Sequence, residues 1–243
     1  MTTIRQALKA MTIAAVLLGL GFAIYAFIKN RPQDVPWAPL DLGETPGMFT
    51  AGKLATLRRE PGRCTALLDR AGVRFDRLAP VGKAGACGYS DGVRLERGGA
   101  RTIGFAPARV GTSCPVAAAL AMFEWHVLQP AAQRHFGERV ATIEHFGSYN
   151  CRRIYGRSSG DWSEHATANA LDLSGLVLSD GTRVSVVRDW EGEGRKARFL
   201  RDVRDGACRL FTTVLSPEYN AAHRDHLHLD QADRGAMGWR ACR

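Results

Sequence analysis

The sequence contains no Cys-x-x-Cys pair, although it has six cysteines. A cysteine-based structural zinc site and a thioredoxin-like redox motif are therefore both unsupported. No internal repeat and no low-complexity tract is present, and a charged fraction of 23% is that of an ordinary globular protein. With 243 residues, 45% of them hydrophobic, the chain is long enough for one sizeable core beside an N-terminal segment.

The sequence also lacks a dense basic run, although its formal net charge is +9. The arginines are scattered along the chain and form no recognised nucleic-acid-binding motif. We therefore expect no nucleic-acid partner. A basic surface still suits an anionic neighbourhood, such as acidic lipid or an anionic cell-wall polymer.

An apolar run extends from Ala10 to Ile28, interrupted only by Thr12 and glycines. About 20 apolar residues suffice to span a bilayer as a helix. A cleavable signal peptide is the alternative, and Gly21-Phe22-Ala23 is its candidate cleavage site, but the apolar run continues past it. We expect residues 1–30 to form an uncleaved signal anchor, a single transmembrane helix.

Positive charges flank both ends of this segment, so charge alone does not give its orientation. The cysteines do, because an even number in a domain after a membrane segment is typical of disulfides in an oxidising compartment. We therefore place the C-terminal bulk outside the cytoplasm. Of the many possible pairings we predict the sequential one: Cys64–Cys87, Cys114–Cys151 and Cys208–Cys242.

Residues 31–60 carry several prolines and glycines, a composition that predicts an extended, partly stiff linker between membrane and domain. The folded domain is expected over residues 61–243. Apolar spacing and glycine stops predict helices over Cys64–Gly72, Val116–His135 and Arg198–Leu215. Strands are expected within Arg74–Arg101 and over Val140–Ile143, Leu171–Leu178 and Arg183–Val187. This mixed order predicts an α+β domain with flanking helices around a small, mainly antiparallel sheet.

Four of the seven histidines lie in two clusters, Ser163–Asp172 and His223–Asp230. Catalytic zinc is commonly held by three imidazole or carboxylate ligands, with one position left open. Residues that lie two positions apart on a strand point to the same face, so His226 and His228 can reach one site. The spacing predicts zinc bound by His165, Asp172 and one of these two histidines. The alternative is a set of buried polar residues satisfied by hydrogen bonds.

At these residues the sequence resembles the bacterial extensin-like C-terminal domain family. More widely, it is similar to zinc peptidases of the lysostaphin, D-alanyl-D-alanine metallopeptidase and hedgehog types. The resemblance covers roughly Cys64 to Asp230 and rests on Ser-x-His-x(6)-Asp at 163–172, on 147–152, and on 219–230 with its His-x-His. One departure is Ala168, where the wider pattern usually has glycine. Alanine at this position departs from the backbone geometry that the family pattern implies, but it removes no metal ligand.

The resemblance implies that His165, Asp172 and His228 bind the metal, since the second histidine of His-x-His is the ligand in such enzymes. It implies that His226 stabilises the oxyanion or positions water, and that Asp225 is the general base. Zinc lowers the pKa of water to about 7, and a nearby carboxylate then shuttles its proton to the leaving amine. The alternatives are a histidine that orients a ligand and a turn aspartate. Asp225 lies at an odd offset from His228, so it needs a bulge or loop to reach the site.

The resemblance also implies an arginine beside the metal, and Arg152 is the candidate, because a guanidinium can grip a carboxylate with two hydrogen bonds. Adjacent Arg153 is the rival, and a plain surface charge is the alternative. Ser163 is expected to order the loop that carries His165 or to bind substrate. It lies in no Gly-x-Ser-x-Gly context, so a nucleophilic role is not expected.

Taken with the compartment, the resemblance implies an inner-membrane, single-pass protein with a zinc peptidase domain in the periplasm. Such an enzyme hydrolyses amide bonds in the peptide stems or crosslinks of peptidoglycan. A zinc-containing binding module without activity is the first alternative, and an amidase cutting the sugar–peptide bond is the second. We expect a monomer, with peptidoglycan as partner and a protein activator as a further candidate partner.

Overall fold

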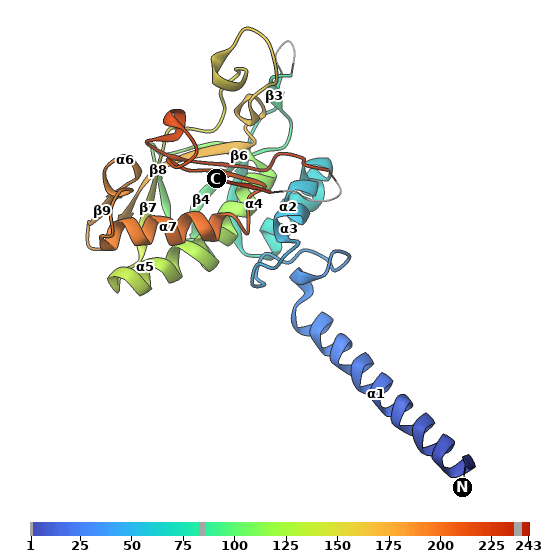
Figure 1. The fold of residues 1–243 in the computed structure, drawn as a ribbon. Helices are drawn as coiled ribbons and strands as arrows, with labels where there is room; N and C mark the ends of the chain where they lie inside the picture. Colours follow the sequence, from blue (N-terminus) through green and yellow to red (C-terminus); the bar gives the residue numbers. More distant parts are fainter. Residues whose placement is uncertain (1, 83–85, 236–239) are drawn as a thin grey trace.

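The computed structural model describes residues 2–82, 86–235 and 240–243 (Figure 1). Helix α1 (Thr2–Asn30) extends away from the rest of the chain. Its residues Thr3–Asn30 are long and apolar enough to cross a membrane, a property that N-terminal signal sequences share. The helix is therefore an anchor or a signal.

Residues 31–60 do not form the expected extended linker. They fold into η1 (Pro32–Asp34), α2 (Thr50–Thr56) and η2 (Leu57–Arg59) against the domain. Four leucines of this segment are almost fully buried and join the main core: Leu40, Leu42, Leu54 and Leu57. The proline and glycine content suggested an open chain, but burial of these leucines offsets the entropy of ordering it.

The predicted helices are present with altered ends. Helix α3 (Pro61–Arg70) is followed by Gly72, whose φ of +69° suits glycine. The long helix runs as α4 (Cys114–Phe123), a π-helical turn η3 (Glu124–Leu128) and α5 (Gln129–Phe136). Helix α7 (Arg195–Ala207) ends earlier than predicted, and its expected last turns form strand β10 (Thr213–Leu215). The threonine and valine of β10 favour a strand, and Val214 is still buried there.

The largest sheet has seven strands, in the order β12-β10-β11-β8-β7-β5 with β9 also paired to β8. Only β10–β12 and β5–β7 are parallel pairs among its described strands. The remaining strands of this sheet are β5 (Gly104–Ala106), β7 (Val140–His145), β8 (Ala170–Leu178), β9 (Arg183–Ser185), β11 (Leu227–Asp230) and β12 (Ala241–Cys242). A second sheet contains β1 (Val73–Arg77), β4 (Gly92–Gly99) and β6 (Gly111–Ser113), and β2 (Val81–Gly82) pairs with β3 (Gly88–Tyr89). The α+β class is confirmed.

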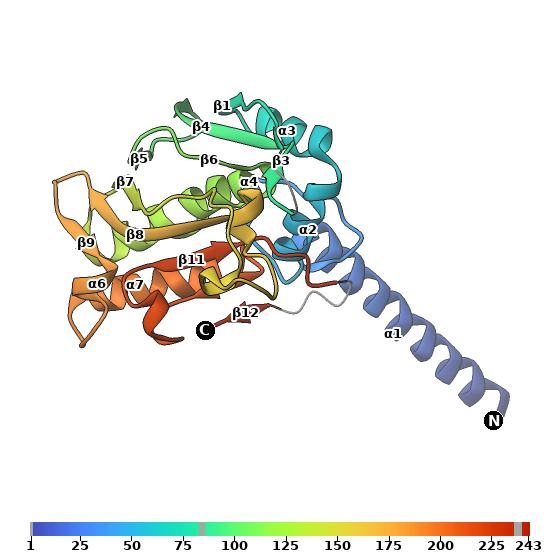
Figure 2. The same cartoon turned by 90° about the horizontal axis from the view of Figure 1, so that it is seen from above.

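Helices cover one side of the large sheet and loops cover the other. In Figure 1, α5 and α7 lie below the strands, and the chain over 146–163 and the turn η6 (Ala221–His223) rise above them. The side chains of Leu171, Leu173, Leu227 and Leu229 are buried in the core. Since side chains alternate along a strand, Asp172 and His228 between these leucines point to the opposite face. Figure 2 shows β8 and β11 side by side, as their pairing requires.

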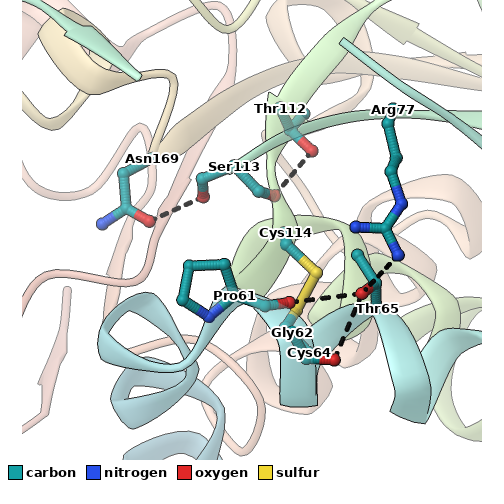
Figure 3. Close-up of a disulfide and its surroundings, with 9 residues drawn as sticks. All are labelled: Pro61, Gly62, Cys64, Thr65, Arg77, Thr112, Ser113, Cys114 and Asn169. Atoms are coloured by element: carbon teal, nitrogen blue, oxygen red, sulfur yellow. Dashed lines mark hydrogen bonds between the residues drawn. A yellow bond between two sulfur atoms is a disulfide. The ribbon is translucent and has the colours of Figure 1, made fainter. Parts of the chain in front are cut away.

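Three disulfides join Cys64 to Cys114, Cys87 to Cys151 and Cys208 to Cys242. The sequential prediction is right for the last pair and wrong for the other two. The chain from β1 to β6 returns to α3, so Cys114 at the start of α4 meets Cys64 (Figure 3). Cys87, before β3, meets Cys151 of the long loop instead. The pairing follows the order of elements in space and not their order in sequence.

Candidate metal centre

Three predicted ligands meet at one point above the large sheet. His165 comes from η5 (Glu164–Thr167), Asp172 from β8 and His228 from β11. Asp172 Oδ1 lies 3.1 Å from His165 Nε2 and 2.9 Å from His228 Nδ1, and the two nitrogens are 3.2 Å apart. Ligands of tetrahedral zinc, with bonds near 2.0 Å, are about 3.3 Å apart. The three atoms therefore form a triangle of nearly the size that such an ion requires.

The outer nitrogen of each ligand histidine is held by a fixed acceptor. His165 Nδ1 lies 2.6 Å from the carbonyl oxygen of Ser148, and His228 Nε2 lies 3.0 Å from Asp230 Oδ2. Each of these nitrogens donates its proton to that acceptor, so His165 Nε2 and His228 Nδ1 are the atoms that can offer a lone pair to a metal ion once any proton on them is displaced. Such outer hydrogen bonds orient metal-binding imidazoles and make them more basic. The donor set fits a divalent metal ion.

The charges at this point favour a cation. Burial disfavours the charge of Asp172, but hydrogen bonds from His165 and His228 outweigh it and hold the pKa of Asp172 well below its usual range. Burial also disfavours a charged His228, but its hydrogen bonds to Asp172 and Asp230 raise the pKa of His228 to about 9. The pocket thus stabilises positive charge beside an ionised carboxylate. A metal ion satisfies the same demand without a proton.

His226 faces the three ligands and Asp225 stands behind it. His226 Nε2 is 3.5 Å from Asp172 Oδ1, and His226 Nδ1 is 2.8 Å from Asp225 Oδ1. Asp225 lies before β11 begins, in the loop that its odd offset required, and its side chain is 39% exposed. Within the described part of the chain, its side chain hydrogen-bonds to His226 and to none of the three ligands. The geometry therefore makes Asp225 the residue that orients His226.

A fourth imidazole, His223, also lies in this cluster. Its ring centre is 5.2 Å from that of His226, and its Nδ1 is 2.7 Å from Asn220 Oδ1. Burial, together with the neighbouring His226 and His228, lowers the pKa of His223 to about 4. His223 is thus neutral beside the centre. The sequence analysis placed His223 in the cluster with His226 and His228 without assigning it a role.

The two neighbouring arginines differ in their surroundings. Arg153 lies over the Trp162 ring and donates to the carbonyl oxygen of Gly160, so it belongs to its own loop. The carbonyl oxygen of Arg152 accepts from the N–H of Ser163 at 3.1 Å, which ties Arg152 to the His165 loop, and its positive charge contributes to the lowered pKa of His223. Ser163 Oγ accepts from the backbone N–H of His165 and so caps η5. Of the two expected substrate-binding residues, Arg152 is near the centre and Ser163 orders the His165 loop.

Buried polar contacts hold the His165 loop in place. Asn169 Nδ2 donates to Glu164 Oε2 at 2.6 Å and to the carbonyl oxygen of Gln231 at 2.9 Å. Ser113, next to the disulfide-bonded Cys114, contacts Asn169 Oδ1 (Figure 3). Asn169 thus ties the ligand loop to β11 and to the start of α4. The sequence analysis did not single it out, because a buried asparagine cannot be told from an exposed one by spacing.

Ala168 adopts a left-handed backbone conformation, with φ of +54° and ψ of +21°. It ends η5, and its N–H bonds to the carbonyl oxygen of His165. Glycine takes this conformation without strain, whereas alanine is disfavoured by about 1–2 kcal/mol. The left-handed conformation explains why the wider pattern has glycine at this position. The three ligand residues still meet although this chain has alanine there.

Aromatic side chains border the centre on its open side. Phe146 packs edge-on against His226 at 5.8 Å between ring centres, and Tyr219 packs against His223 at 5.4 Å. Both are largely exposed. The Tyr155 hydroxyl accepts from Asn220 Nδ2, which ties the 146–163 loop to η6. The sequence analysis did not identify Phe146 or Tyr155 as members of the site.

Fold and site together define a disulfide-linked α+β domain with a His–Asp–His group that can hold a metal ion. The family model described as "Extensin-like protein C-terminus" matches residues 62–243, and the chain belongs to that family. A search of curated proteins finds no match. A search of solved structures finds none either.

Proposed function

We propose that this protein is a membrane-anchored, periplasmic zinc peptidase that hydrolyses amide bonds in peptidoglycan stems or crosslinks. The observation that carries the proposal is the triangle of His165, Asp172 and His228, with edges of 2.9 to 3.2 Å. Zinc suits a set of two imidazoles and one carboxylate with an open side. The substrate class comes from the resemblance to cell-wall zinc peptidases and from the compartment that the disulfides indicate.

His165, Asp172 and His228 would hold zinc, which would supply a Lewis acid able to polarise the scissile carbonyl and lower the pKa of water. The chain's own proton carrier is His226. Its Nδ1–H donates to Asp225, so Nε2 is free to take a proton from the attacking water and return it to the leaving amine. Asp225 therefore orients the base and stabilises its charged form. This assignment replaces the direct role in proton transfer that the resemblance implied for Asp225.

Arg152 is the residue we assign to the substrate's carboxylate. Peptide stems end in carboxylates, and a guanidinium binds them with two parallel hydrogen bonds. Phe146 and Tyr219 flank the histidines and offer apolar walls on either side. For a peptide laid between them, we assign the scissile bond to His226 and the terminal carboxylate to Arg152.

The test uses the full chain, purified with its disulfides intact. Metal content is measured together with release of new fragments from purified peptidoglycan, for the wild type, His228→Gln and His226→Gln. We expect close to one zinc per wild-type chain, loss of zinc and activity in His228→Gln, and loss of activity with zinc retained in His226→Gln. The masses of the fragments identify the bond.

The matched control is His135→Gln, because His135 also bonds to a carboxylate, Asp202, at 2.8 Å, but lies on α5. It should keep both zinc and activity. Zinc without cleavage would favour the binding module or an enzyme that needs a protein activator. A chain that binds no zinc contradicts the proposal.

A further inference from the structure

The end of α1 is joined to the domain without a spacer. The N–H of Arg31 bonds to the carbonyl oxygen of Phe27, and the N–H of Asp34 bonds to that of Arg31. Lys53 Nζ of α2 donates to the carbonyl oxygen of Pro32 at 3.0 Å. The helix therefore passes directly into η1, and α2 holds that junction.

This junction fixes the depth of the first domain residues. The apolar run ends at Ile28, and a helix of about 20 residues crosses the hydrocarbon core of a bilayer. Residues 29–31, at about 1.5 Å per residue, then fall in the headgroup region. Asp34 follows three residues later, and its Oδ1 accepts from the N–H of Met48 at 2.7 Å. This hydrogen bond holds Met48 beside Asp34, which follows the headgroup residues closely in the chain.

Two large apolar side chains are exposed at this end of the domain. Trp37 is 76% exposed and Met48 is 65% exposed. Both line a groove of about 850 Å³ between the 36–40 segment, α2 and the chain around residue 233. Of the described residues that line it, five are cations and one is a carboxylate, Asp233. The cations are Lys53, Arg59, Arg63, Arg234 and Arg240.

These features match the chemistry of a bilayer surface. Tryptophan is enriched at the level of the headgroups, and lysine and arginine near the surface attract anionic lipids. Asp34 and Glu44 beside the junction carry the opposite charge, and Arg59 and Arg63 pair with Asp233 and Glu60. Cations still outnumber carboxylates in the groove. In Figure 1 the 146–163 loop, which borders the metal centre, rises on the side away from α1.

We infer that Trp37, Met48 and the cations of this groove dock onto the anionic phospholipid headgroups of the membrane that α1 spans. The domain then lies on the bilayer surface, with its metal centre turned towards the space beyond. The inference requires that α1 stays on the mature chain, and it does not depend on the chemistry of the metal centre.

The experiment places the full chain in vesicles and follows the fluorescence of Trp37, obtained as the difference between wild type and Trp37→Tyr. Vesicles of anionic phosphatidylglycerol mixed with phosphatidylcholine are compared with phosphatidylcholine alone and with detergent. We expect quenching of Trp37 by lipids brominated near the headgroup, and several-fold weaker quenching by water-soluble acrylamide than in detergent. Both effects should be larger in the anionic vesicles.

The matched control adds a tryptophan at Val187, another exposed apolar residue, on α6 (Val186–Asp189) at the end of the domain remote from α1. In the Trp37→Tyr, Val187→Trp chain the new tryptophan should stay open to acrylamide. If Trp37 in vesicles is as open as this control, the proposal is overturned. Equal quenching of Trp37 in the anionic and the phosphatidylcholine vesicles would contradict the proposed role of anionic headgroups.

Two further outcomes also overturn it. Soluble peptidoglycan fragments that protect Trp37 in detergent, where lipid vesicles do not, would assign the groove to the wall polymer. A mature membrane-extracted chain whose mass lacks α1 would remove the anchor on which docking depends. Failure of the peptidase assay leaves the fluorescence result unchanged, so the two proposals are tested separately.

Discussion

Asp172 and His228 lie directly opposite each other on the antiparallel strands β8 and β11, and their side chains meet at 2.9 Å. The register places both on the face of the sheet opposite to α5 and α7. Each neighbour in sequence is a buried leucine that packs on the other side. The sheet therefore holds two of the three proposed ligands at a fixed spacing before any metal binds, and only His165 arrives from a loop.

Asp230 should set the affinity for the metal ion without touching it. It accepts the outer N–H of His228 at 3.0 Å, so Asp230→Asn weakens the orientation and basicity of that ligand. Loss of such a partner typically reduces metal affinity about 10- to 100-fold. Competition with a chromogenic chelator measures the change. Asp202→Asn, which removes the carboxylate beside His135, is the matched control and should leave the affinity unchanged.

Metal binding should become tighter as the pH rises towards about 9. The raised pKa of His228, about 9, means that the metal-free protein holds a proton there at neutral pH. The metal must displace that proton, so apparent affinity falls as the pH is lowered below this value. Calorimetry in buffers of different ionisation enthalpy counts the protons released at pH 7. Binding without proton release would contradict the prediction.

The same raised pKa of His228 predicts how the stability of the metal-free fold changes with pH. A charged His228 is favoured in the folded state, so its contribution is complete below the unfolded pKa of about 6.5 and is lost as the pH rises through about 9. Urea unfolding of chelator-treated protein should therefore show falling stability from pH 6.5 to 9. His228→Gln should remove this part of the pH dependence.

Ala168→Gly should stabilise the protein. The left-handed backbone of Ala168 disfavours its methyl group, and removing the methyl should add about 0.5–1 kcal/mol to the free energy of unfolding, after the entropy of the unfolded glycine is allowed for. Ala166→Gly is the control, because Ala166 lies inside η5 and glycine there should be destabilising. Urea denaturation compares the two. Equal destabilisation by both changes would show that the conformation of Ala168 is not strained.

Asn169→Ala should destabilise the domain and loosen the His165 loop. The change removes the Asn169 donor from the buried carbonyl oxygen of Gln231 and from Glu164, which keeps its contact with Arg58, at a cost of about 1–3 kcal/mol. Metal affinity should fall as well, because η5 carries His165. Asn150→Ala is the control: its side chain is exposed, and the backbone bond from Asn150 to His165 remains. An effect of Asn169→Ala no larger than that of the control would contradict the prediction.

Local sequence patterns determined much of this protein. The apolar run at 10–28 indicated α1, and the alternation through 171–173 and 227–229 placed leucines inside and the ligand residues outside. Such signals depend on residues close in sequence, since the periods of helix and strand are short. The ligand triad followed from residue types and spacing together with the family resemblance, and the fold brings the three residues together.

Only the tertiary structure decided which distant residues meet. Which cysteines pair depends on where the chain returns, and the leucines of residues 31–60 become core only because the domain offers them a surface. The orientation of His226 by Asp225, and of His228 by Asp230, likewise depends on the turn before β11 and on its register. Burial and hydrogen bonding stabilise contacts between residues whatever their separation in the sequence. The sequence alone therefore determined many of the elements and the candidate ligands, whereas packing decided their partners, the fold of residues 31–60 and the strand β10.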